Sequence, residues 1–187
     1  MDATTKKADT SLGFLRRNLA SLPTQIKSQC YKTLVRPILE YASPVCDPHT
    51  ASKINKLESV QRRAARFVVG DYRTTSSTSQ MIHDLEWPSL QQRREDSKVV
   101  LVYMIVHALV DIQSTSYLHP QCIATRGHTL RRAFPFCRTG IYRYSFFPSG
   151  IRLWNQLPAH LATIISLDTL KAGLALELLS LFYPVFS

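Results

Sequence analysis

Apolar positions recur every three or four residues along most of the chain, which is the spacing of one face of an α-helix. The clearest pattern begins after Thr50, a good N-cap residue, and runs to Val69, with Gly70 expected to end the helix. Its apolar positions are Ile54, Leu57, Val60 or Gln61, Ala64, Phe67 and Val68, and its opposite face holds Lys53, Lys56, Arg62, Arg63 and Arg66.

Weaker patterns of the same kind predict further helices. We expect them over residues 10–19, 23–41, 77–85, 87–110, 148–157 and 166–181. Pro37 has no amide donor, so it must kink the second of these helices or restart it. The longest, from Trp87 to about Val110, is charged in its first half and apolar nearly all round in its second. An all-apolar helix is expected to be buried in its own core or against a partner.

The pattern changes after Ser114. Thr125–Phe136 and Ile141–Phe147 hold alternating or β-prone residues separated by Cys137–Gly140, which predicts a small β-hairpin. We therefore expect a mainly α fold, in which a helical bundle is followed by a smaller α+β tail with this hairpin. The expected segments are a flexible leader (1–9), a helical bundle (10–73), a helical extension with the long apolar helix (74–118) and a carboxy-terminal tail region (119–187).

Charge narrows the choice of partners. The 187 residues include 23 Lys and Arg against 13 Asp and Glu, a net charge of +10. Such an excess favours a polyanionic partner, either nucleic acid or an acidic membrane surface. The longest apolar run, Val99–Val110, is too short to cross a bilayer, so no transmembrane segment is predicted. Four widely spaced cysteines and a polar amino terminus favour reduced thiols and an intracellular location, in cytoplasm or nucleus.

Catalytic constellations are missing from the sequence. Its carboxylates are scattered, and the one adjacent pair, Glu95-Asp96, stands among bases, where a salt-bridged face is the simpler interpretation. The spacing of Cys122, His128 and Cys137, with His119, matches no usual zinc signature, which favours buried cysteines and surface histidines. We predict no catalytic site, no metal and no cofactor, and a free-standing enzyme is the least favoured hypothesis.

The basic face of the helix ending at Val69 is the strongest binding candidate. Arg62 and Arg66 share a face at a spacing of four, with Arg63 beside them, so three guanidinium groups can meet one phosphate backbone. The same spacing also suits a solvated face with partners such as Glu58. The predicted nucleic-acid-binding residues are Lys53, Arg62, Arg63 and Arg66, then Arg93, Arg94 and Lys98. Four aromatic residues, Tyr142, Tyr144, Phe146 and Phe147, can stack bases or, as we prefer, face a core.

A series of short motifs adds information through its order. They are LRRNL (15–19), LVRPILEYAS (34–43), DPHT (47–50), LESVQRRAARF (57–67), LEW (85–87), RGH (126–128), YSFFP (144–148) and IRLWNQLP (151–158). This series resembles the carboxy-terminal region of animal non-LTR retrotransposon reverse transcriptases, of LINE or jockey-like type, over residues 12–171. The chain departs from the pattern at Cys46, where the family usually has Trp, and after Lys171.

The resemblance implies a thumb of helices that holds the template–primer duplex, followed by a carboxy-terminal extension. The family's catalytic Tyr-Ala-Asp-Asp lies upstream of this region, and Tyr41-Ala42-Ser43-Pro44 lacks both aspartates. We therefore expect a non-catalytic piece of an RNA-directed DNA polymerase that contacts phosphates of RNA or an RNA–DNA hybrid. The alternatives are a protein-interaction module, whose Val99–Val110 helix docks on a reverse-transcriptase palm or a host protein, and a decayed retrotransposon reading frame without independent function.

Overall fold

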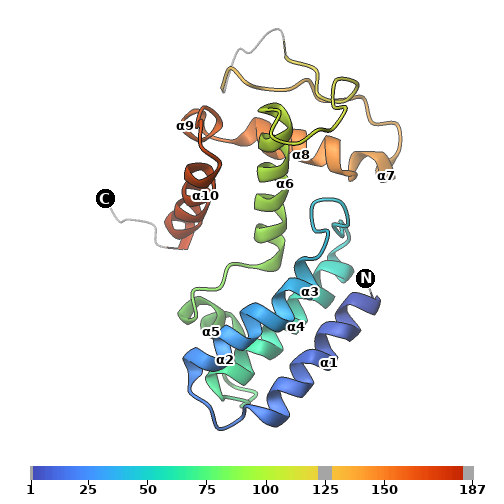
Figure 1. Cartoon of the computed structure of the whole chain (residues 1–187). Coiled ribbons are helices and arrows are strands. Elements are labelled where there is room, and N and C mark those ends of the chain that lie inside the picture. Colours follow the sequence, from blue (N-terminus) through green and yellow to red (C-terminus); the bar gives the residue numbers. More distant parts are fainter. Residues whose placement is uncertain (1, 122–127, 183–187) are drawn as a thin grey trace. The chain divides into compact units, whose positions relative to one another are not determined.

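The computed structural model describes residues 2–121 and 128–182, with side chains for residues 3–121 and 128–176 (Figure 1). The fold is mainly helical, and no strand occurs within these ranges. The chain divides into two compact units, an amino-terminal unit, Met1–Arg93, and a carboxy-terminal unit, Arg94–Ser187. Each unit has its own core and is described by itself.

The amino-terminal unit is a bundle of helices, each of which buries one apolar face. It contains α1 (Asp2–Asn18), α2 (Thr24–Cys30), a π-helical turn η1 (Tyr31–Val35), α3 (Arg36–Glu40), α4 (Ala51–Val69), α5 (Thr78–Asp84) and the first turn of α6 (Leu90–Val106). Helix α1 packs against η1, α3 and α4, and α4 also packs against α2 and α5. The central core side chains are Leu12, Leu15, Tyr31, Val35, Leu39, Val60, Ala64 and Val68.

Helix α4 confirms the strongest helical prediction. It begins after Thr50 and ends at Gly70, whose backbone is left-handed (φ 79°) and whose N–H donates to the Arg66 carbonyl over 2.8 Å. A left-handed residue at this position is the usual helix stop, and glycine adopts it without steric strain. The predicted apolar face is buried, and both Val60 and Gln61 belong to it.

Helix α1 is longer than its pattern predicted. Residues 2–9, which were expected to form a flexible leader, make its first two turns. Ala8 is fully buried in the stripe that continues with Leu12 and Leu15 at spacings of four and three. The small side chain of Ala8 makes a core contact that the hydrophobic pattern of the sequence did not predict.

Proline interrupts the second predicted helix, as expected. Pro37 lies in the first turn of α3, and the preceding turn widens so that the Arg36 N–H donates to the carbonyl of Tyr31, five residues back. Because Pro37 cannot donate a hydrogen bond, the wider turn satisfies the backbone just before it.

The carboxy-terminal unit surrounds the apolar half of α6. It adds α7 (Gly140–Arg143), α8 (Phe146–Gln156), α9 (Ala159–Ala162) and α10 (Leu167–Phe182). Its core side chains include Val99, Val102, Tyr103, Trp154, Leu161 and Leu170. Helix α6 ends at Val106 rather than near Val110, because Ala108 turns to φ 52° and the Leu109 N–H closes on the Met104 carbonyl.

The predicted β-hairpin is wrong for the described residues. Ile141–Phe147 lies in α7 and the start of α8, and the Thr139 hydroxyl caps α7 by accepting from the Tyr142 N–H. Residues 128–136 are irregular apart from an isolated bridge between Pro120 and Arg132, and residues 125–127 lie outside the described ranges. The Arg132 N–H donates to the Asn155 side chain of α8 and not to a second strand.

Candidate nucleic-acid interface

The four predicted site residues on α4 lie at its surface, but their side chains diverge. Lys53 is exposed. Arg63 donates to the Asp9 carboxylate of α1 over 2.6 Å. Arg62 donates to the Asn55 carbonyl (3.4 Å) and Arg66 to the Arg73 carbonyl (2.8 Å). The three guanidinium groups therefore have different partners, and only that of Arg63 lies on another helix.

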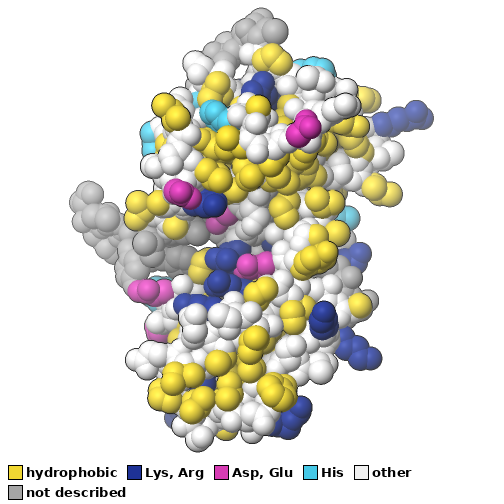
Figure 2. Space-filling model, viewed as in Figure 1, with side chains coloured by type: hydrophobic (Ala, Val, Ile, Leu, Met, Phe, Trp, Pro, Cys, Tyr) yellow, Lys and Arg dark blue, Asp and Glu magenta, His cyan; other side chains and the backbone are white. Residues whose placement is uncertain are grey.

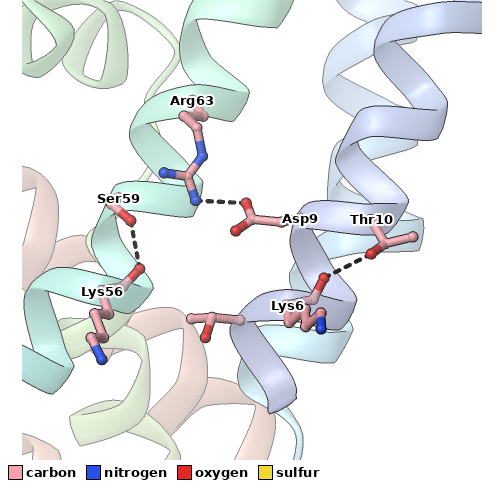
Figure 3. Close-up of a pocket in the computed structure, with 7 residues that line it drawn as sticks. Lys6, Asp9, Thr10, Lys56, Ser59 and Arg63 are labelled. Atoms are coloured by element: carbon pink, nitrogen blue, oxygen red, sulfur yellow. Dashed lines mark hydrogen bonds and ion pairs between the residues drawn. The ribbon is translucent and has the colours of Figure 1, made fainter. Parts of the chain in front are cut away.

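Arg63 belongs to a hollow between α1 and α4 that the sequence did not predict (Figure 3). The hollow has a volume of ≈ 520 Å³ and is lined by Thr5, Lys6, Asp9, Thr10, Lys56, Ser59 and Arg63. Lys6 and Lys56 are exposed on its two walls, and Arg63 stands beyond them on α4. The lining thus contains three cationic side chains and one carboxylate, of which only Arg63 binds Asp9, so its net charge is positive.

Two hydroxyl groups that line the hollow are hydrogen-bonded to the backbone of their own helices. The Thr10 hydroxyl donates to the Lys6 carbonyl (2.9 Å) and the Ser59 hydroxyl to the Lys56 carbonyl (2.7 Å). Asp9 engages one nitrogen of Arg63, and a guanidinium group carries five N–H donors, so donors remain for a second acceptor. An anion held here would meet ammonium groups from both helices.

Further cations extend along α1. Lys7, Arg16 and Arg17 are exposed, and the Arg16 guanidinium lies 5.2 Å from the centre of the Tyr72 ring. Figure 2 shows Lys and Arg side chains along the edge of this unit where α1 lies. The sequence prediction omitted α1 because its first residues were assigned to a leader. The pair Lys6-Lys7, just before the apolar stripe that begins at Ala8, was the sequence feature that could have indicated a basic surface on α1.

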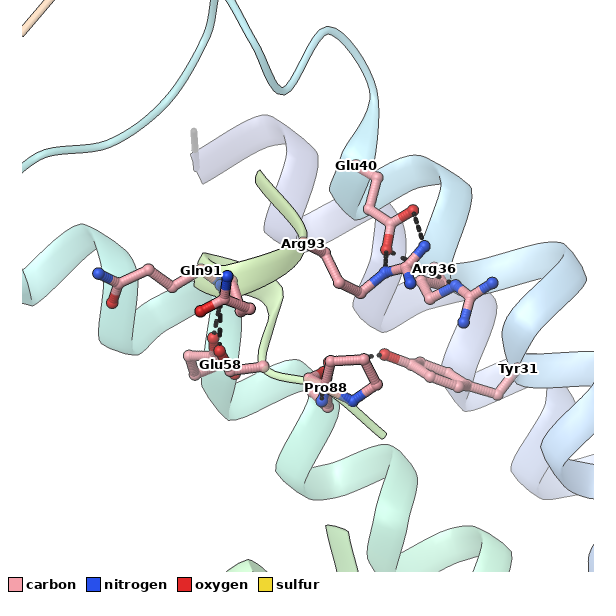
Figure 4. Close-up of polar contacts among 10 residues, drawn as sticks. Tyr31, Arg36, Glu40, Glu58, Pro88, Gln91 and Arg93 are labelled. Atoms are coloured by element: carbon pink, nitrogen blue, oxygen red, sulfur yellow. Dashed lines mark hydrogen bonds and ion pairs between the residues drawn. The ribbon is translucent and has the colours of Figure 1, made fainter. Parts of the chain in front are cut away.

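Arg93 has a structural partner. Its guanidinium binds both carboxylate oxygens of Glu40, with Nη2 3.1 Å from Oε2, and Arg36 lies 3.6 Å from the same carboxylate (Figure 4). Burial lowers the pKa of Arg36, and the nearby Arg93 lowers it further, whereas Glu40 opposes the shift. Glu40 therefore holds two guanidinium groups together, which makes Arg93 a structural residue at the edge of the amino-terminal unit.

The segment leading into α6 is anchored by neighbours of this ion pair (Figure 4). Gln61 donates to the Pro88 carbonyl (2.9 Å) and accepts from the Tyr31 hydroxyl (3.4 Å), while Glu58 accepts from the Gln91 N–H (3.0 Å). The Tyr31 ring stacks on Trp87 with centres 4.4 Å apart. Burial raises the pKa of Tyr31, so its hydroxyl stays protonated at neutral pH. Glu58 thus accepts a hydrogen bond at the start of α6.

Arg94 and Lys98 are not available as surface contacts. Their side chains are only 3% and 4% exposed. They continue the stripe of Leu90 and Val102 at a spacing of four, so the buried face of α6 includes its charged half. The prediction that these two residues reach phosphates does not agree with this burial.

The apolar half of α6 is also covered. Val102 and Tyr103 pack with Trp154 and Leu170 of the same unit. This half of α6 is therefore part of the core of its own unit, and the interaction-module hypothesis stays a prediction.

Histidine and cysteine side chains do not assemble into a metal site in the part of the chain that the structure describes. His128 was expected at the surface, but it is buried, and its Nε2 lies 2.9 Å from the Trp154 carbonyl, to which it donates. Cys137 is half-buried, and Cys122 lies outside the described residues. Among the same residues, no helix combines the length and hydropathy needed to cross a bilayer.

Comparison of the chain with protein-family models, with curated proteins and with solved structures finds no match. Function is therefore argued from the site itself and from the motif order of the sequence.

Proposed function

We propose that the amino-terminal unit grips the phosphate backbone of a nucleic-acid duplex, and that the chain is a non-catalytic piece of a non-LTR retrotransposon reverse transcriptase. The observation that carries the proposal is the hollow between α1 and α4, which Lys6, Lys56 and Arg63 line from two helices. The expected ligand is an RNA–DNA hybrid or RNA.

Phosphate contact fits this hollow better than recognition of a base. Its cations are Lys6 and Lys56, exposed and flexible, and Arg63, whose planar group binds phosphate oxygens well. The lining contains no aromatic ring on which a base could stack. Binding through such groups fixes a duplex in place without reading its sequence.

The motif order supports the assignment to a reverse-transcriptase thumb. Two of the motifs bind the same segment of chain, since Glu40 of LVRPILEYAS binds Arg93 and Glu58 of LESVQRRAARF accepts from the Gln91 N–H, both just after LEW. These motifs are thereby parts of the amino-terminal unit, which carries the basic surface. In the family that the sequence resembles, a helical unit at this position holds the template–primer.

Salt dependence tests the proposal directly. The full chain is titrated into a labelled RNA–DNA hybrid at increasing salt. Neutralising three phosphates predicts a slope near −2.7 in log–log form, or a roughly 40-fold loss of affinity between 50 and 200 mM salt. Affinity that does not change with salt, or no binding at all, would overturn the proposal.

A charge-reversal pair locates the contact. Lys6→Glu with Lys56→Glu leaves the Asp9–Arg63 pair in place and is expected to weaken hybrid binding by at least tenfold and to reduce the salt slope by about two. The matched control, Arg152→Glu with Lys171→Glu, makes the same change of charge at exposed residues of the carboxy-terminal unit. If both pairs weaken hybrid binding equally, net charge and not the hollow is responsible.

A further inference from the structure

Two phenylalanine rings of the carboxy-terminal unit are exposed to solvent. Phe134 is 51% exposed and Phe136 is 91% exposed. They line a hollow of ≈ 390 Å³ together with Pro135, Cys137 and Arg143. This volume lies within the range of small-ligand sites, about 300–1,000 Å³. None of these residues lines the hollow between α1 and α4.

The backbone that carries these rings is held at both ends. Before them, the Trp154 indole donates to the Leu130 carbonyl (2.9 Å), and the Asn155 side chain both accepts from the Arg132 N–H and donates to its carbonyl. After them, the irregular segment ends at the Thr139 cap of α7 (Figure 1). The two rings thus lie on an irregular segment that is anchored by hydrogen bonds before and after them.

The surroundings of the hollow are purely cationic in sequence. Between Ile112 and Leu167 the chain contains no Asp, no Glu and no Lys, and its formal charges are Arg126, Arg131, Arg132, Arg138, Arg143 and Arg152. Arg143 lines the hollow, and Arg138 is exposed between the hollow and α7. A ligand that fits must therefore offer a flat apolar face and negative charge together.

We propose that this hollow binds single-stranded nucleic acid, with a base stacked on Phe136 or Phe134 and neighbouring phosphates held by Arg143 and Arg138. Aromatic rings combined with arginine are the usual means of binding an unpaired strand. In a duplex the faces of the bases are covered by their neighbours, so only an unpaired base can offer its face to Phe136. This site goes beyond the duplex contact proposed above and does not depend on it.

The test uses the full chain carrying Lys6→Glu and Lys56→Glu, so that the amino-terminal unit contributes little. Its binding to a short labelled oligo(U) is measured beside the same chain with Phe136→Ala. Loss of one base stack is expected to weaken binding by about tenfold. Arg143→Ala is expected to weaken oligo(U) binding and to reduce the salt dependence of that binding. Phe136→Trp is expected to keep the affinity for oligo(U).

Matched controls separate stacking from general effects. Ile141→Ala removes an apolar side chain that is 87% exposed but outside the hollow, and Arg152→Ala removes an exposed arginine of α8. Both are expected to bind oligo(U) as the parent does. An abasic oligomer of equal length is expected to bind as weakly to the parent as oligo(U) binds to the Phe136→Ala chain.

Three results would overturn this inference. The first is equal binding of oligo(U) and the abasic oligomer, which would show that charge alone, without base stacking, accounts for binding. The second is equal loss with Phe136→Ala and Ile141→Ala. The third is Phe136-dependent binding to vesicles of anionic lipid without binding to oligo(U), which would make the hollow a membrane contact. Absence of hybrid binding by the unmodified chain bears only on the duplex proposal.

Discussion

Glu40 and Arg93 form a two-pronged ion pair that joins α3 to the first turn of α6 across 53 positions of sequence. Their side chains are 23% and 31% exposed, so the pair is shielded from solvent more than a typical surface salt bridge. Arg36 shares the same carboxylate. Removing Glu40 would take the shared carboxylate away from two neighbouring guanidinium groups.

We expect Glu40→Gln to lower the free energy of unfolding by about 1–2 kcal/mol, because a two-pronged charged hydrogen bond is lost. A double-mutant cycle with Arg93→Met, followed by urea denaturation, measures the coupling between the two residues. The coupling should be about 1 kcal/mol or more. Additive effects of the two substitutions would show that the pair contributes nothing of its own.

Two tryptophans differ in their hydrogen bonds and should respond differently to replacement. The buried Trp154 donates from its indole to the Leu130 carbonyl, whereas the Trp87 indole N–H makes no hydrogen bond to any described protein group. Trp154→Phe removes both packing and a donor and should cost about 2–4 kcal/mol. Trp87→Phe removes packing alone and should cost less in the same denaturation experiment. The reverse order would refute this assignment.

Gly70 and Gly140 make a matched pair for backbone strain. A Cβ atom at either position meets nothing within 4 Å, but only Gly70 has a positive φ, of 79°. Gly70→Ala should therefore destabilise the protein by about 1–2 kcal/mol through strain alone. Gly140→Ala should be neutral or stabilise by up to about 1 kcal/mol, since its conformation suits alanine. Thermal unfolding of the two variants checks this contrast.

Asp71 should give a pH-dependent contribution to stability. Hydrogen bonds from the Arg73 guanidinium, then from the Ser76 hydroxyl, hold the pKa of Asp71 well below its usual range. A carboxyl whose pKa is depressed by folding stabilises the protein above its unfolded pKa, about 3.9, and loses that effect as pH falls toward the folded value. Asp71→Asn should therefore lower the melting temperature at pH 7.

The difference in melting temperature between Asp71→Asn and the unmodified chain should shrink steadily below about pH 4, where the unfolded carboxyl takes up its proton. A difference that stays constant down to pH 2 would exclude the proposed cause.

Local chemistry in the sequence was enough to predict α4, the break at Pro37 and the short helix over residues 77–85. Gly70 marks the end of α4 through a backbone preference that needs no distant partner, whereas Thr50 precedes the helix without a side-chain capping hydrogen bond. The Ser77 side chain accepts from the Gln80 N–H within its own turn. The basic face of α4 could be identified in the same way, including Lys56 and Arg63.

What the sequence determined by itself is therefore a set of helices with a basic stripe, because helix periodicity and capping act within a few residues. Tertiary packing decided the rest. Ala8 extended α1, Asn155 replaced a strand partner for Arg132, and the burial of Arg94 removed a predicted contact. Packing also placed Lys6 opposite Lys56. Each of these outcomes depends on a partner far away in the chain, and hydrophobic spacing contains no information about that partner.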